Sequence, residues 1–219
     1  MIDLYKLDFL GYNTIKNYNI KYRETLMRII AATQNINKLN EISHITKDFG
    51  MGLVSQAEAG LGHLNIEETG STCEENSYIK AKTISDLTGE PAIADDSGLF
   101  VDALGGEPGV NSARYSGVHG DDAAARKIIL KKLEGLPYKK RTAMFVCVIT
   151  LVYPDGRVIQ ARGECKGHIS YEEKGSGGFG YDSIFIPEGR RRTFAQMPQS
   201  YKDQNGHRGR ALQRLRELL

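Results

Sequence analysis

Residues 92–117, AIADDSGLFVDALGGEPGVNSARYSG, open on an apolar run that passes directly into two adjacent carboxylates, Asp95 and Asp96. The segment PAIAD at 91–95 has the composition of a buried strand, so we expect the acids where that strand ends. Neighbouring carboxylates repel each other, and desolvation raises their pKa values unless a cation compensates. Two explanations stay open: a divalent ion such as Mg²⁺ binds the pair, or one acid caps the following turn and the other faces water.

Strands and helices alternate around this segment, and a hairpin comes later in the chain. We expect strands at 27–33, 52–57, 91–95 and 183–186, helices at 35–50, 72–89, 121–135 and 209–219, and a hairpin of 142–153 and 157–165 around the turn PDG. This order indicates an α/β fold with a mixed sheet. Residues 1–26 have no clean period and are interpreted as an extension of unassigned role, which leaves 27–219 as one domain.

The composition excludes several classes of protein. A net charge of +2 over 219 residues is too small to hold nucleic acid or an anionic membrane by field alone. The three cysteines are widely spaced and lack a CxxC pair, which argues against a disulfide framework and a zinc site. The chain shows no secretory signal and no apolar run of membrane-spanning length, so we expect a cytoplasmic protein.

Two motifs contain groups suited to phosphate. ATQNINK at 32–38 leads from a strand into a helix, where free N–H groups and Lys38 suit an anion, although Thr33 and Asn35 acting only as caps explains the motif equally simply. EETGST at 67–72 places two acids just before a capped helix that carries Lys80, for which a solvated side chain is the default expectation.

Two further motifs suit a flat ring. GSGGFGYD at 175–182 combines glycines, which allow close backbone approach, with Phe179, which can stack on a base; a mobile surface loop is the alternative. NGHRGRAL at 205–212 places His207 and Arg208 at a helix start, where positive charge opposes the helix dipole and needs a reason. GRRR at 189–192 is interpreted as a solvated loop.

Taken together, the order of these motifs, with TFAQM at 193–197, resembles the inosine triphosphate pyrophosphatase family over 27–219. The resemblance implies an elongated α/β fold with a long mixed sheet, flanking helices and two lobes around a central nucleotide-binding cleft. It also implies a homodimer that uses Mg²⁺ to hydrolyse the non-standard purine triphosphates dITP, ITP and XTP to monophosphate and pyrophosphate, cleansing the nucleotide pool.

By position, the resemblance assigns Glu67 and Asp96 as metal ligands, with Asp95 beside them, and Asp96 as the general base. Lys38, Lys80 and Lys202 are expected to stabilise phosphate oxygens, and a donor at His207 or Arg208 to recognise the O6 acceptor of the base. The resemblance also places Phe179 to Asp182, Lys202, His207 and Arg208 in the base-recognition and closing segments. The substrate-binding positions it implies are Thr33, Gln34, Asn35, Ile36, Asn37, Lys38, Lys80, Ser97, Phe179, Gly180, Tyr181, Asp182, Lys202, His207 and Arg208.

The sequence departs from the family pattern at Gln34, where Gly is common, at Gly206, where Ser is usual, at Cys73, where a larger apolar residue is frequent, and in the extension. None of these changes removes an expected metal ligand or phosphate cation. Three alternatives remain: a pyrophosphatase for modified pyrimidine triphosphates, a catalytically silent nucleotide sensor, and a nucleic-acid-binding domain that uses GRRR and the C-terminal helix. Loss of the acids is expected for the sensor, and the low net charge weighs against the nucleic-acid binder.

Overall fold

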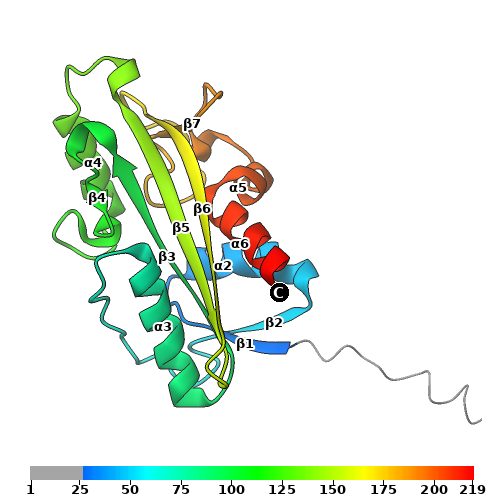
Figure 1. The fold of residues 1–219 in the computed structure, drawn as a ribbon. Helices are drawn as coiled ribbons and strands as arrows, with labels where there is room; N and C mark the ends of the chain where they lie inside the picture. The colour runs from blue at the N-terminus through cyan, green and yellow to red at the C-terminus, as the bar shows by residue number, and fades with distance from the viewer. Residues whose placement is uncertain (1–26) are drawn as a thin grey trace, which may run out of the picture.

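One twisted mixed sheet forms the centre of the protein (Figure 1). The computed structural model describes residues 27–219, so the extension expected at 1–26 lies outside the described residues. The sheet has the strand order β2-β1-β3-β5-β6-β7, with β4 paired to β3; β1 runs parallel to β2 and β3, and the other pairs are antiparallel. Its strands are β1 (Met27–Ala31), β2 (Met51–Ser55), β3 (Ala92–Val101), β4 (Pro108–Gly109), β5 (Thr142–Val152), β6 (Val158–Ile169) and β7 (Phe185–Pro187).

Five α-helices within the described range cover this sheet, and Figure 1 shows α3 on one side of it and α2 and α6 on the other. They are α2 (Ile36–Thr46), α3 (Cys73–Thr88), α4 (Asp122–Lys132), α5 (Gln199–Asn205) and α6 (His207–Leu218). The mixed α/β fold expected from the sequence is confirmed. The helix α5 was not predicted, because its seven residues include one aromatic, Tyr201, and so carry no apolar period.

Strand β3 differs from the prediction in a way that matters for the site. The strand was expected to end at Asp95, but it continues to Val101, because all ten of its residues pair with β5 from Val152 back to Ala143. The two acids therefore lie in the middle of a central strand. This pairing joins residues about 50 positions apart in the sequence, and the local pattern around the acids does not show it.

Alternation along the central strands sends successive side chains to opposite faces of the sheet. On β3, Ile93 packs in the core beneath α2 and α6, whereas Ala92 and Ala94 pack in the core beneath α3. Both cores are fully buried, which explains the nearly continuous apolar composition of these strands.

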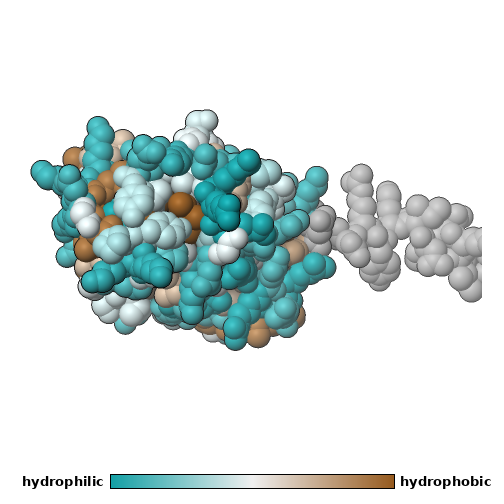
Figure 2. Space-filling view, turned by 90° about the horizontal axis from the view of Figure 1, so that it is seen from above, coloured by the Kyte–Doolittle hydropathy of each residue, from teal (hydrophilic) through white to brown (hydrophobic). Residues whose placement is uncertain are grey.

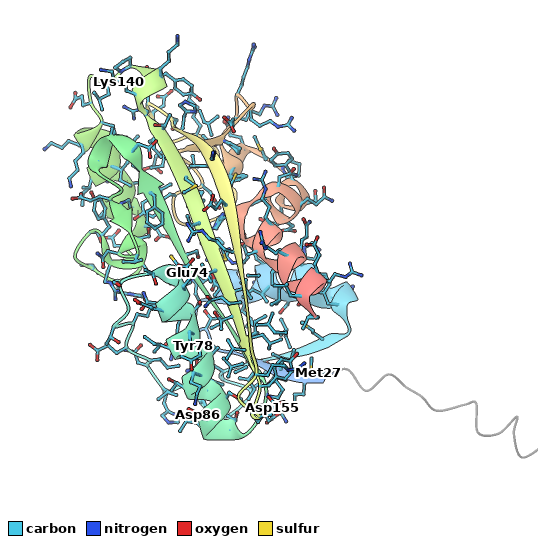
Figure 3. All side chains as sticks on the ribbon, in the orientation of Figure 1. Met27, Glu74, Tyr78, Asp86, Lys140 and Asp155 are labelled. Carbon is cyan, nitrogen blue, oxygen red and sulfur yellow. The ribbon has the colours of Figure 1, made fainter. Side chains whose placement is uncertain are left out.

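The long strands β3, β5 and β6 connect two separate cores. Ile93 belongs to the core near β1, and Leu99 belongs to a second core that includes Ile129 of α4 and Phe185 of β7. Lys140 and Asp155, labelled in Figure 3 near the two ends of β5, show how far this hairpin extends through the molecule. The acid pair lies on β3 between the two cores.

The hairpin predicted around PDG is confirmed. β5 and β6 pair over eleven positions, and the turn is closed by the Tyr153 N–H donating to the Arg157 carbonyl at 2.9 Å. Gly156 in this turn has φ of 88°, a conformation that favours glycine.

Helix α6 lies so close to β6 that a side chain does not fit between them at Gly163. A Cβ atom there would lie 2.2 Å from the His207 carbonyl oxygen and 2.3 Å from the Ala211 nitrogen. We expect Gly163→Ala to lower the free energy of unfolding by about 1–3 kcal/mol, because backbone atoms must move apart. Urea unfolding measures the change, and Gly62→Ala, whose Cβ would meet only ordinary contacts at 3.4 Å, is the control. Equal stabilities of the two variants would contradict the close packing.

None of the helices in residues 27–219 is long and apolar enough to cross a membrane. On the face that Figure 2 shows, hydrophobic residues form small separate spots among hydrophilic ones.

Candidate active site

A cavity of about 340 Å³ opens beside the middle of β3 and collects most of the residues singled out from the sequence. Its lining includes Thr33, Gln34, Asn35, Lys38, Glu67, Lys80, Asp96, Ser97, Phe179, Gly180, Tyr181, Asp182, Lys202, His207 and Arg208. Ile36 and Asn37 are not among the lining residues: Ile36 is exposed on α2, and Asn37 lines a second depression, to which Phe179 also contributes. Segments separated by more than 100 residues thus meet at one place.

The two acids point in different directions, since neighbouring residues of a strand face opposite sides of the sheet. Asp95 is fully buried on the side of α2 and α6, where Arg208 Nη2 donates to its Oδ2 at 2.8 Å and Lys38 Nζ lies 3.3 Å from its Oδ1. Although burial alone raises the pKa of Asp95, these cations hold it well below the usual range. The expectation that both acids face one metal ion therefore changes: Asp95 is neutralised by protein cations.

Asp96 lies on the opposite side, under α3. Its Oδ1 is 3.4 Å from Lys80 Nζ, and Asn76 Nδ2 donates to its Oδ2 at 3.4 Å. Lys80 is also buried and binds Glu68 at 2.5 Å, so it is not the solvated lysine that its helix position suggested. The capping box of Thr72 and Glu75 fixes the start of α3 and hence the position of these side chains.

Burial raises the pKa of Asp96, and nearby Glu68 and Asp95 add to the effect, although Lys80 and Lys38 oppose it. Its charge is thus less well compensated than that of Asp95, and an added cation would stabilise it. Glu67 is exposed and lines the same cavity. One or two carboxylates in an open, wet cavity suit Mg²⁺, which keeps several waters and binds substrate phosphates. Within residues 27–219 no three His, Cys, Asp or Glu side chains are grouped as a metal site, so the protein offers this cavity at most a pair of carboxylates. Such a pair suits Mg²⁺ that keeps water and phosphate ligands, and Glu67 and Asp96 stay the predicted ligands.

The turn before α2 is a capped helix start as well as a wall of the cavity. Asn35 Oδ1 accepts from the N–H groups of Asn37 and Lys38 at 3.0 and 3.2 Å, and Thr33 Oγ1 accepts from the Asn35 N–H at 3.1 Å. These N–H groups already have acceptors, so Lys38 is the group of this turn best placed to attract phosphate. Gln34 donates to the carbonyls of Gly62 and Leu64 at 3.2 and 2.8 Å, which ties the turn to the loop leading to Glu67.

The other end of the cavity is built around Phe179. Lys202 Nζ lies 4.3 Å from the centroid of its ring and binds Asp182 at 2.6 Å and Glu41 at 2.8 Å. Burial raises the pKa of Asp182, an effect that Lys202 opposes. Lys202 thus lies between two carboxylates and against the Phe179 ring. This is the end of the cavity where a nucleobase could stack. Of the two roles that the resemblance implies for Lys202, this position favours base recognition over a phosphate contact.

Arg208 is committed to the protein through most of its donors. It binds Asp95 through Nε and Nη2, Glu41 through Nη1, and Ser97 through Nη2. Arg208 and Lys202 hold the pKa of Glu41 below its usual value, although burial works in the other direction. A guanidinium has five N–H groups, and one N–H on Nη1 has no acceptor among residues 27–219. The placement of positive charge at a helix start is explained by these buried anions.

His207 stacks on Phe145, with ring centroids 4.5 Å apart and planes at 10°. Burial, with help from Arg208 and Lys202, lowers the pKa of His207 well below its usual value, so the ring is neutral at pH 7. A neutral imidazole offers one donor and one acceptor. Beside it, Gly206 has no room for a side chain, because a Cβ would lie 2.6 Å from the Lys202 carbonyl oxygen. Gly206, which departs from the family pattern, therefore allows α5 and α6 to lie close together.

Sequence reasoning missed three residues that hold the site together. Glu41 pairs with Arg208 and Lys202, Glu68 pairs with Lys80, and Asn76 contacts Asp96. Glu68 is the second acid of EETG, but nothing in the local sequence distinguishes it from Glu67, because its pairing with Lys80 appears only in the fold. Glu41 lies in the second turn of α2, where a charged residue is ordinary, and its partners are about 160 residues away.

The three cysteines are buried, and their thiols are expected to be unreactive in the folded protein. Burial raises the pKa of Cys165 to about 11 and that of Cys73 to about 12, and raises that of Cys147 as well. At pH 8, a thiol of pKa 11 is ionised to only ~10⁻³, and only the thiolate reacts. We expect a disulfide reagent at pH 8 to titrate no thiol in the native protein and three after unfolding in guanidinium. Rapid reaction of one thiol in the native protein would contradict this packing.

Titratable side chains from distant segments gather in one cavity beside the middle of a long mixed sheet. This arrangement is typical of the active site of an α/β enzyme. Comparison with known proteins then identifies the family. The Ham1 family matches residues 29–218. The dITP/XTP pyrophosphatase of Desulforamulus reducens is 44% identical over 193 residues, which cover 88% of this chain and 96% of that protein.

Solved structures agree with this match. A HAM1 protein from Coxiella burnetii has a TM-score of 0.79 and 39% identity, covering 88% of this chain and 98% of its own. The Staphylococcus aureus Ham1 protein has a TM-score of 0.77 and 37% identity, covering 87% and 97%. The chain belongs to the Ham1 family. The resemblance drawn from the sequence motifs and the expectation of an enzyme are both confirmed.

Proposed function

We propose that the protein hydrolyses the non-standard purine triphosphates dITP, ITP and XTP to the monophosphate and pyrophosphate with Mg²⁺. The observation that carries the proposal is the pair of Asp96 and Lys80, which lie 3.4 Å apart, buried, and facing the same cavity. A base and a fixed cation are the minimum that water attack on a phosphate needs. The printed names of relatives such as the D. reducens dITP/XTP pyrophosphatase support the choice of substrate.

Asp96 acts as the general base that orients a water and takes its proton, and burial raises the pKa of Asp96, which makes it a stronger base. The water attacks the α-phosphorus in line, and pyrophosphate leaves. Lys38 and Lys80 stabilise charge on the phosphate oxygens, in surroundings where fixed charges act strongly. Glu67 and Asp96 would hold Mg²⁺, which would supply positive charge to the phosphates and a lowered pKa for a bound water.

The base binds at the end of the cavity formed by Phe179, His207 and Arg208. Hypoxanthine and xanthine present an O6 acceptor, whereas adenine presents an amino donor. The neutral His207 ring, the free N–H of Arg208 or a backbone N–H beside them donates to O6. Adenine leaves that donor unpaired, which costs about 1–3 kcal/mol per group.

Three further parts of the proposal come from the family resemblance: removal of faulty nucleotides from the cellular pool, a homodimer, and a cytoplasmic location. Light scattering of the purified protein measures its mass in solution, and twice the 24.3 kDa of one chain is the expected result.

A substrate panel tests the proposed function. Pyrophosphate and orthophosphate release are measured separately from ITP, XTP, dITP, GTP, ATP and a modified pyrimidine triphosphate, each with Mg²⁺ and with EDTA. We expect pyrophosphate from ITP, XTP and dITP only, and none with EDTA. Guanine shares the O6 acceptor, so the expected rejection of GTP comes from a clash or a misplaced partner at its 2-position. Binding without release would favour a silent sensor, release from the pyrimidine would move the substrate class, and release of orthophosphate would place the cleavage elsewhere.

A further inference from the structure

Two side chains of helix α4 bind the loop that carries Phe179. Asp122, the first residue of α4, accepts the N–H of Gly180 at 2.9 Å. One turn later, Arg126 Nη1 donates to the carbonyl of the same Gly180 at 2.7 Å, and its Nε binds Glu173 at 2.8 Å. Both polar groups of one glycine are therefore bound by side chains of a helix more than 50 residues earlier in the chain.

This glycine directly follows Phe179 and sets the direction of its ring. Gly180 has φ of 61°, in the left-handed region, so the chain reverses sharply at this point. On its other side, the N–H of Phe179 donates to Asp182 at 2.9 Å. The Phe179 carbonyl also accepts the N–H of Asp182 at 3.1 Å, so of four hydrogen bonds that fix the backbone around Phe179, two are local to the loop and two come from α4.

The ring itself has room to move if these contacts are lost. Phe179 is only half-buried, and it lines both the main cavity and the depression formed with His44 and Asp203. Local packing also limits this loop, because the Gly177 N–H donates to the Ala195 carbonyl at 3.0 Å and Lys202 Nζ lies 4.3 Å from the centroid of the Phe179 ring. The two contacts from α4 add to these and bind the residue directly after Phe179.

We propose that Asp122 and Arg126 are positioning residues that hold Phe179 ready to stack on the purine of the substrate. This inference rests on the proposed function, and it adds two residues that the sequence motifs did not indicate. Arg126 is not a lining residue of the cavity, so it acts through Gly180, whereas Asp122 also reaches the cavity wall.

The expected signature follows from the chemistry of stacking. Every purine has a π-face, so stacking does not depend on the pattern of donors and acceptors at its edge. An interaction made equally in the ground and transition states lowers KM without changing kcat. Loosening Phe179 should therefore raise KM for all accepted nucleotides by the same factor, whereas loss of an edge contact changes the preference between them.

The test compares Asp122→Ala and Arg126→Gln with two matched controls. Asp122→Asn keeps an oxygen that accepts the Gly180 N–H, and Lys127→Gln removes an exposed charge from the same helix. We expect KM for ITP and XTP to rise about tenfold in each test variant, with kcat within twofold of the wild type. The ratio of kcat/KM for ITP to kcat/KM for XTP should stay unchanged. The double variant should show less than the product of the two effects, because both contacts hold one glycine. KM values equal to those of the wild type in both test variants would overturn the proposal.

Amide hydrogen exchange of the unliganded protein provides a second readout that needs no activity. The Gly180 N–H is expected to exchange about tenfold faster in Asp122→Ala than in Asp122→Asn, since its acceptor is lost. If the wild-type protein releases no pyrophosphate from any nucleotide, the proposed function is wrong. The exchange measurement would still test the α4 contact in that case. Unchanged exchange would show that Asp122 does not hold the loop.

Discussion

Asp96→Asn should lower kcat for pyrophosphate release from ITP by about 10²–10⁴-fold, because the amide cannot take a proton from water. The fold should survive the change. Burial raises the pKa of Asp96, which means that the folded state disfavours its charged form. Removing that charge relieves this cost, but it also takes away one of the carboxylates that raise the pKa of buried Lys80, while Glu68 remains at 2.5 Å. The two effects oppose each other, so the melting temperature is expected to change little although activity is lost.

Steady-state kinetics and thermal unfolding of the same preparation check this prediction. Asp86→Asn, which removes an exposed carboxylate from the last turns of α3, is the matched control and should have wild-type kcat. An Asp96→Asn protein with near-normal kcat would exclude Asp96 as the base. An Asp96→Asn protein that is inactive because it is unfolded would contradict the charge balance described for this strand.

Arg208→Gln is expected to lower the free energy of unfolding by about 3–5 kcal/mol, since it leaves two buried carboxylates without their main partner. Arg208 is 2% exposed, and both Asp95 and Glu41 bind it. Lys38 and Lys202 remain near these acids and limit the loss. Urea unfolding measures the change, and Arg210→Gln, two residues along α6 and exposed, should change stability by less than about 0.5 kcal/mol.

The same network predicts how stability depends on pH. The pKa values of Asp95 and Glu41 lie below their ordinary values of 3.8 and 4.5 in the folded protein. Groups with depressed pKa values stabilise the fold above their unfolded pKa, and that stabilisation is lost as pH falls through the folded pKa. The wild type should therefore lose stability below about pH 4.5 more steeply than Arg208→Gln, whose acids are already less favoured as anions. Parallel pH profiles would show that Arg208 does not control these acids.

Much of the fold could be predicted from local sequence, because the decisive signals are short. The apolar segments at 27–33 and 142–153 are strands, and the capping box at Thr72 starts α3 as expected. The end of β3 could not be predicted, because pairing with β5 continues the strand through two acids. Turn residues show where a strand is able to end, but pairing with a neighbouring strand determines whether it ends there.

The site was predictable as a set of residues and less so as a set of contacts. Most motif positions line one cavity, yet Asp95 turned out to pair with Arg208, 113 residues away, and Lys202 to lie under Phe179. Such pairs depend on which face each strand residue takes and on how helices cross the sheet. Neither property is contained in a motif.

Hydrolysis of ITP in ¹⁸O-labelled water, followed by mass spectrometry of both products, tests the central claim most directly. If the Asp96 water attacks the α-phosphorus, one ¹⁸O enters the monophosphate and none enters pyrophosphate during a single turnover. Label in pyrophosphate, with unlabelled monophosphate, would show attack on the β-phosphorus and would contradict the assignment of Asp96 and Lys80 to the reacting phosphate.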